Sequence, residues 1–209
     1  MKNYTEKELK VLNQQLKGVA PGEIIQWAIL NRNQPVVTTN FRPYEAAILH
    51  ACSQIKPDIK VIWCDTGYNT PPTYKHANNV IDILNLNVKL YNPEQTSAYR
   101  NAIMGGIPEL DSPEFDEFSR QVKLEPFQRA MKEQNPDVWF TNLRQGQTAF
   151  RDSIDILSYS KDGLLKVSPF YYWSDQKLNV YLVENELPNE FVYFDPTKVL
   201  SNRECGLHS

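Results

Sequence analysis

The sequence has few cysteines, and no two of them form a motif. Cys52, Cys64 and Cys205 are scattered along 209 residues without a Cys-x-x-Cys pair. This pattern is too sparse for a disulfide framework and excludes a cysteine-ligated zinc site or iron–sulfur cluster. Cys52 falls in an apolar helical stripe and Cys64 ends an apolar strand, so both are expected to be core residues. Any thiol chemistry is therefore expected from a single cysteine.

Long apolar runs and an excess of positive charge are also missing. No stretch approaches the roughly 18 consecutive apolar residues that cross a membrane, and the N-terminus lacks the basic-then-apolar order of a secretory signal. The 22 Lys and Arg against 25 Asp and Glu give a formal charge of −3, which argues against binding nucleic acid through bulk charge. With 41% hydrophobic residues, one soluble, cytoplasmic domain is expected, with neither nucleic acid nor membrane as a partner.

Strand-like segments alternate with helical ones along the chain. Strands are expected at residues 34–39, 60–64, 88–91 and 138–141, and helices at 23–30, 43–55, 71–84 and within 93–135. Pro43 is expected in the first turn of its helix. Residues 154–159 and 164–168 are expected to form a hairpin, and Ser174 to cap a last helix that reaches Leu187 before Pro188. This order predicts an α/β fold with a mostly parallel wound sheet and flanking helices.

Polar clusters lie at the carboxyl ends of three of the expected strands. They are Thr38-Thr39-Asn40, Asp65-Thr66-Gly67 and residues 142–151. In open α/β sheets, ligands bind beyond the carboxyl ends of the strands, where helix N-termini offer N–H groups to anions. These clusters therefore predict an anion site at one edge of the sheet.

Basic residues are concentrated in one part of the chain. Residues 118–151 contain six basic and three acidic side chains, a local charge of +3, so the rest of the chain carries −6. Arg144 and Arg151 are able to hold phosphate or sulfate oxygens through paired hydrogen bonds. For Arg120, Arg129 and Lys132, a solvated helix face is the plainer interpretation. The charge distribution favours a small anionic ligand.

The segment Arg203-Glu-Cys-Gly-Leu-His208 lies one residue from the end of the sequence. Arg203 and His208 are able to favour a reactive thiolate at Cys205. A frayed tail with an incidental thiol is the alternative. A metal site is not expected, because His50 and His76 lie in helical sequence without a partner at metal spacing.

Four segments, in the same order, resemble the phosphoadenylyl-sulfate (PAPS) reductase family. They are residues 59–68 (Ile-Lys-Val-Ile-Trp-Cys-Asp-Thr-Gly-Tyr), residues 123–126 (Lys-Leu-Glu-Pro), residues 139–144 (Trp-Phe-Thr-Asn-Leu-Arg) with Gln147 and Arg151, and the tail at 203–208. The resemblance covers about residues 20–187 and the tail. It implies an adenine nucleotide alpha hydrolase-like fold, in which residues 1–187 form a sulfonucleotide-binding α/β domain and residues 188–209 form a mobile C-terminal tail with the catalytic cysteine.

The resemblance also implies a reaction. The Cys205 thiolate attacks the sulfur of PAPS, expels adenosine 3′,5′-bisphosphate and forms an S-sulfocysteine, from which reduced thioredoxin or glutaredoxin releases sulfite for cysteine biosynthesis. The resemblance implies a homodimer, and it implies no bound cofactor. The missing cluster cysteines favour the 3′-phosphorylated substrate over adenylyl sulfate. The implied catalytic residues are Cys205 and His208, and the implied substrate-binding residues are Thr38, Thr39, Asp65, Thr66, Gly67, Lys123, Arg144, Gln147, Arg151 and Arg203.

Two segments depart from the family pattern and keep two other hypotheses open. Residues 38–45 read Thr-Thr-Asn-Phe-Arg-Pro-Tyr-Glu where the family has small residues, and residues 188–202 are shorter than the family's basic lid. A different reaction, that of an ATP pyrophosphatase, requires a glycine-rich loop that residues 38–45 lack. A nucleotide-binding module without reductase activity is the third hypothesis, and the short lid motivates it.

Overall fold

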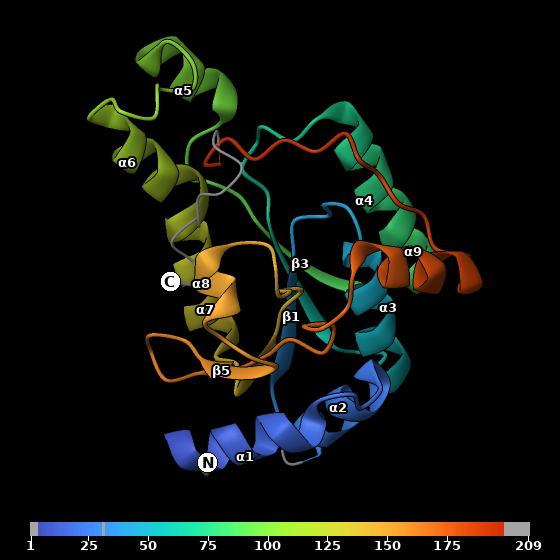
Figure 1. Cartoon of the computed structure of the whole chain (residues 1–209). Coiled ribbons are helices and arrows are strands. Elements are labelled where there is room, and N and C mark those ends of the chain that lie inside the picture. Colours follow the sequence, from blue (N-terminus) through green and yellow to red (C-terminus); the bar gives the residue numbers. More distant parts are fainter. Residues whose placement is uncertain (1–3, 31, 199–209) are drawn as a thin grey trace.

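The computed structural model describes residues 4–30 and 32–198, and within them six strands form one sheet (Figure 1). The strands are β1 (Pro35–Thr39), β2 (Lys60–Cys64), β3 (Asn87–Tyr91), β4 (Val138–Phe140), β5 (Leu157–Tyr159) and β6 (Leu165–Val167). Their order is β3-β2-β1-β4-β6-β5, and β5 alone among these six runs antiparallel to its neighbour. The mostly parallel sheet and the β5–β6 hairpin are both confirmed.

Helices connect the strands and cover both faces of the sheet. They are α1 (Glu6–Leu16), α2 (Pro21–Ile29), α3 (Glu45–Ile55), α4 (Pro71–Leu84), α5 (Ser97–Met104), α6 (Glu114–Ser119), the π-helix η1 (Arg120–Leu124), α7 (Glu125–Gln134), α8 (Ala149–Asp152) and α9 (Asp175–Glu184). None of these helices in the described ranges is long and apolar enough to cross a membrane.

Two predicted helix ends are wrong. Pro43 lies before α3 rather than in its first turn, because Tyr44 has a φ of 68° in the left-handed region and the helix begins only at Glu45. Ser174 caps α9 as predicted, accepting a hydrogen bond from the Lys177 N–H at 3.2 Å. The helix nevertheless stops at residue 184, because the backbone turns left-handed at Glu186 (φ 54°).

Side chains of β1, β2 and β4 alternate between two cores. Val37 and Phe140 point toward α2, α3, α4 and α9, which form the larger core on one face of the sheet. Ile62 and Trp139 point to the other face and pack with Ala130 of α7. Figure 1 shows α3, α4 and α9 on one side of the sheet and α6 and α7 on the other. β1, β2 and β4 are thus buried on both faces, as their nearly continuous apolar sequences indicate.

The chain after α9 returns to the top of the sheet. Residues 188–198, called the strap, contain no helix or strand and pass beside the first turn of α4 (Figure 1). The hydroxyls of Thr70 and Thr73 donate to the Val192 carbonyl at 2.7 and 2.9 Å, and the Tyr44 N–H donates to Asn189 Oδ1 at 2.8 Å. These contacts attach the strap to the loops beyond the carboxyl ends of the strands.

Candidate active site

The direction of winding changes at β1. This strand pairs with β2 on one side and with β4 on the other, and the sheet continues outward to β3 and to β6. Chain segments that leave two such strands diverge, and the crevice between them is where open α/β sheets bind ligands. A cavity lies at this point, lined by Thr38 and Thr39 from β1 and by Thr141 and Asn142 after β4. The topology alone therefore positions a site where the polar clusters were expected.

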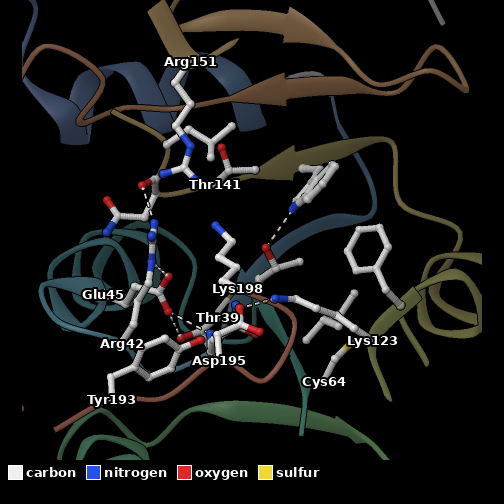
Figure 2. Close-up of a pocket in the computed structure, with 17 residues that line it drawn as sticks. Thr39, Arg42, Glu45, Cys64, Lys123, Thr141, Arg151, Tyr193, Asp195 and Lys198 are labelled. Carbon is white, nitrogen blue, oxygen red and sulfur yellow. Dashed lines mark hydrogen bonds and ion pairs between the residues drawn. The ribbon is translucent and has the colours of Figure 1, made fainter. Parts of the chain in front are cut away.

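Cationic side chains outnumber anionic ones around the cavity (Figure 2). The charged residues that line it are the cations Arg42, Lys123, Arg151 and Lys198 and the carboxylates Glu45 and Asp195. Four positive charges against two negative charges leave a local charge of +2. Such a concave cationic surface attracts small anions from solution.

The loop after β1 closes around the carboxylate of Glu45. Thr39 Oγ1 and the Asn40 N–H each donate to Glu45 Oε2 at 2.8 Å, and Arg42 Nε donates to Oε1 at 2.7 Å. Arg42 also donates through Nη2 to the Asn142 carbonyl at 3.1 Å, which joins the loops after β1 and β4. Thr39 therefore lies in the cavity wall, but its hydroxyl is bonded to a carboxylate of the chain itself.

The floor of the cavity is formed by side chains of the strands. Trp139 Nε1 donates to Thr38 Oγ1 at 2.9 Å, and Cys64 lies beside them. Burial raises the pKa of Cys64 to about 12, and complete burial also raises the pKa of Cys52. Both cysteines of the described chain are therefore protonated thiols near neutral pH and poor nucleophiles.

Lys123 forms a buried ion pair with Asp195 of the strap. The two side chains are 3% and 6% exposed, and Lys123 Nζ also donates to Thr197 Oγ1 at 3.3 Å. Burial alone would raise the pKa of Asp195, but the Lys123 ammonium and the Thr197 hydrogen bonds outweigh burial and lower it. Lys123 therefore lines the cavity while one of the strap's carboxylates neutralises its charge.

Arg151 and Arg144 differ in their surroundings. Arg151 lies on α8, is buried in the cavity wall and donates through Nη1 to Gln147. Arg144 lies outside the cavity lining, where it pairs with Asp175 at 2.6 Å and its guanidinium lies 5.6 Å from the centre of the Tyr44 ring. Arg144 thus holds the start of α9 against the α3 loop.

The loop after β2 is organised by the Asp65 carboxylate. The Gly67 N–H, Asn69 Nδ2 and the Tyr74 hydroxyl donate to it at 3.0, 2.8 and 2.9 Å. Gly67 has a φ of 79°, a conformation that favours glycine. Thr66 accepts from the Tyr68 N–H at 3.2 Å. These contacts stabilise the loop, which does not contribute to the lining of the cavity.

The structure brings part of the predicted site together. The predicted residues that line the cavity are Thr38, Thr39, Lys123 and Arg151. Those outside its lining are Asp65, Thr66, Gly67, Arg144 and Gln147, whose roles toward substrate stay predictions. Arg203, Cys205 and His208 lie outside the described residues. Glu45 and Asp195 were not predicted from the sequence, although the polar run Asp-Pro-Thr-Lys directly after the apolar residues 191–194 is a signal for the second.

The chain matches known proteins over most of its length. The family model of the phosphoadenosine phosphosulfate reductase domain matches residues 34–196. A phosphoadenosine 5′-phosphosulfate reductase of Synechococcus sp. is 35% identical over 182 residues, which cover 86% of this chain and 78% of the relative. The corresponding protein of Xanthomonas oryzae is 36% identical over 87% of this chain and 75% of its own.

Solved structures show the same fold. The PAPS reductase of Candida auris in a phosphate complex superposes with a TM-score of 0.78 at 24% identity, covering 89% of both chains. An NH3-dependent NAD synthetase of Campylobacter jejuni superposes with a TM-score of 0.55 at 11% identity, covering 88% of this chain and 79% of its own. The expected fold class is thus confirmed. By its family model and its relatives, this chain belongs to the phosphoadenosine phosphosulfate reductase family.

Proposed function

We propose that this protein reduces PAPS to sulfite and adenosine 3′,5′-bisphosphate. The observation that carries the proposal is the cationic cavity at the switch point between β1 and β4, in a chain whose relatives are named as reductases of this substrate. The phosphosulfate group is a small anion, and the charge of +2 around the cavity suits it. Thr38, Lys123 and Arg151 are the described side chains proposed to face it, since all three line the cavity.

The proposed nucleophile is Cys205, which lies outside the described residues. Its thiolate forms a bond to the substrate sulfur, and the bond from that sulfur to the bridging phosphate oxygen breaks, so that adenosine 3′,5′-bisphosphate leaves with the electron pair. A dithiol protein, thioredoxin or glutaredoxin, then attacks Cys205 Sγ, releases sulfite, and resolves the mixed disulfide with its second thiol. The dithiol supplies both electrons, and no bound cofactor is needed.

The position of Lys198 supports this role for Cys205. Lys198 lines the cavity, and Cys205 follows it by seven residues in the sequence (205 − 198 = 7). An extended chain spans up to about 3.3 Å per residue, so seven residues reach roughly 23 Å. A tail of this length is sufficient to bring the thiol to the cavity despite the short segment at 188–202. We propose that Arg203 contacts an anionic group of the substrate and that His208 is a second catalytic residue.

Several further properties belong to the same proposal. We propose a cytoplasmic enzyme that acts as a homodimer, with residues 188–209 as a separate functional segment. The exposed Phe191 and Val192 of the strap support an interaction surface at this segment, because they are 64% and 55% exposed.

One assay tests the reaction and its nucleophile together. Sulfite release is measured from PAPS and from adenylyl sulfate with reduced thioredoxin, for the wild type, Cys205→Ser and Cys52→Ala. Cys52 is the matched control because it is buried in α3, away from the cavity. We expect release from PAPS in the wild type and in the control, and none in Cys205→Ser. Equal turnover by Cys205→Ser, or release from adenylyl sulfate alone, would contradict the proposal.

A further inference from the structure

The helical segment that carries Lys123 contains a widened turn. α6, η1 and α7 follow one another without a break from Glu114 to Gln134, and η1 between them is a π-helix. The Glu125 N–H bonds to the Arg120 carbonyl, five residues back, whereas an α-helical N–H bonds four residues back. One residue is thus added to the helical turn that contains Lys123.

A proline follows this turn directly. Pro126 is the second residue of α7 and is buried. In an uninterrupted α-helix its ring would clash with the carbonyl of Val122, four residues back, and that carbonyl would have no N–H donor. A π-helical turn adds a residue and opens this spacing. The widened turn therefore accommodates the proline ring.

The added residue changes the direction in which the side chains point. Successive residues of an α-helix are about 100° apart, so one added residue rotates the preceding segment by about that angle relative to α7. The buried residues Phe118, Val122, Pro126 and Ala130 follow at intervals of four. In an α-helix each such interval drifts by about 40°, and the widened turn compensates for the drift. The π turn thus keeps one face of the segment buried along its length.

Lys123 is directed inward by the same turn. It lies beside the buried Val122, and its ammonium pairs with Asp195 and donates to Thr197 Oγ1 at the cavity. Figure 2 shows its side chain extending toward Asp195 of the strap. A rotation of about 100° at this position would take the ammonium away from both partners and from the cavity.

We propose that Pro126 is a positioning residue, whose ring maintains the π turn of η1 so that the turn holds Lys123 at the cavity. Pro126 lies outside the cavity lining, so it acts through Lys123. The inference rests on the proposed function for the contact of Lys123 with substrate. The position of Lys123 can nevertheless be tested without the reaction, through its pair with Asp195.

Two substitutions restore an N–H at this position. Pro126→Ala removes the ring, and Pro126→Val removes it while filling most of its space, so a change seen in both variants does not come from a cavity. Both permit an uninterrupted α-helix. Pro113→Ala is the matched control, because Pro113 is the exposed N-cap of α6, where an N–H has no partner within the helix.

The first measurement is the coupling between Pro126 and the Lys123–Asp195 pair in urea denaturation. Asp195→Asn is made in the wild type, in both Pro126 variants and in Pro113→Ala. Its shift of the urea midpoint should be at most about half as large in the Pro126 variants as in the other two backgrounds, because the pair is already separated there. An equal shift in all backgrounds overturns the inference. Failure of both Pro126 variants to fold also overturns it, because a proline needed only to direct Lys123 can be replaced by residues that helices accept.

The second measurement distinguishes positioning from general stabilisation. In steady-state kinetics, both Pro126 variants should raise the KM for PAPS by about fivefold or more and change kcat less than about twofold, as loss of a binding contact does. A loss of stability alone would lower the active fraction, and therefore kcat, at constant KM. That result, or unchanged kinetics, overturns the inference. If none of the proteins releases sulfite, the proposed reaction fails, and the urea experiment alone decides the role of Pro126.

Discussion

Lys123 of η1 and Asp195 of the strap are 72 residues apart in the sequence and form a buried ion pair beside the cavity. The pair joins the helical layer on one face of the sheet to the segment that leads into the C-terminal tail. It also places a carboxylate next to a lysine that is predicted to bind substrate. The strap is thus part of the site, and this pair of charges adds to the hydrogen bonds that hold Asn189 and Val192 in place.

Removal of one charge of this pair should strongly destabilise the fold. Asp195→Asn leaves the Lys123 ammonium buried without its counter-charge, so the free energy of unfolding should fall by about 3 kcal/mol. Urea denaturation measures the change. The double variant Lys123→Met, Asp195→Leu should recover most of the loss, because an apolar pair leaves no uncompensated charge. A loss in Asp195→Asn no larger than in Glu117→Gln, which breaks an exposed pair, would contradict the prediction.

The same pair predicts a dependence on pH. The pKa of Asp195 lies below its ordinary value of 3.8 in the folded chain. A carboxyl whose pKa is lowered by folding stabilises the fold fully at any pH above its pKa in the unfolded chain. This stabilisation is lost as the pH falls through the pKa of the same carboxyl in the folded chain. The difference in the free energy of unfolding between the wild type and Asp195→Asn should therefore decrease below about pH 4. Urea denaturation at pH 7 and at stepwise lower pH checks this, and a constant difference down to pH 3 would refute it.

Thiol reactivity should separate the cysteines. Burial raises the pKa of Cys64 to about 12 and raises that of Cys52 as well, so neither forms an appreciable thiolate in the folded protein at neutral pH. Iodoacetamide at pH 7 should therefore modify Cys205 alone, and all three cysteines in urea. Peptide mass spectrometry identifies the labelled sites. Rapid labelling of Cys64 in the folded chain would show that the floor of the cavity opens.

Most of the fold could be predicted from the sequence because it depends on local patterns. The apolar runs of β1 and β2 and the Asp-Gly turn of the β5–β6 hairpin are short-range signals, and the alternation of strand and helix then permits few topologies. The start of α3 could not be predicted, because Pro43 is compatible with a first turn. The left-handed Tyr44, whose N–H is bonded to Asn189 of the strap, overrides this preference.

The site could be predicted only in part for a similar reason. Thr38 and Thr39 end β1 and Arg151 lies in the basic segment, and the topology brings them to one edge of the sheet. Glu45 and Asp195 were not predicted because a site for an anion is expected to contain cations rather than carboxylates. Their role depends on contacts with Arg42 and Lys123 that no spacing in the sequence reveals.

The contact between α1 and β5 is expected to protect the edge of the sheet. Asn13 Nδ2 donates to the Leu157 carbonyl at 3.0 Å, and the Leu157 N–H donates to Asn13 Oδ1 at 2.8 Å. The side chain thus pairs with an edge strand as another strand would. Asn13→Ala should lower the free energy of unfolding by about 2 kcal/mol, because two buried backbone groups lose their partners. The exposed Gln14→Ala is the control in urea denaturation, and equal effects of both substitutions would show that the pairing contributes nothing.

Arg151 and Arg144 should have separable effects on activity and stability. Arg151 lines the cavity, so Arg151→Ala should raise the KM for PAPS by roughly tenfold or more through loss of a charged contact to the substrate. Arg144 pairs with Asp175 and stacks on Tyr44 outside the cavity lining, so Arg144→Ala should lower the melting temperature and change KM much less. Steady-state kinetics and thermal unfolding of both variants test the contrast. The reverse order, with KM more sensitive at Arg144, would mean that substrate binding draws this guanidinium away from Asp175 and into the cavity.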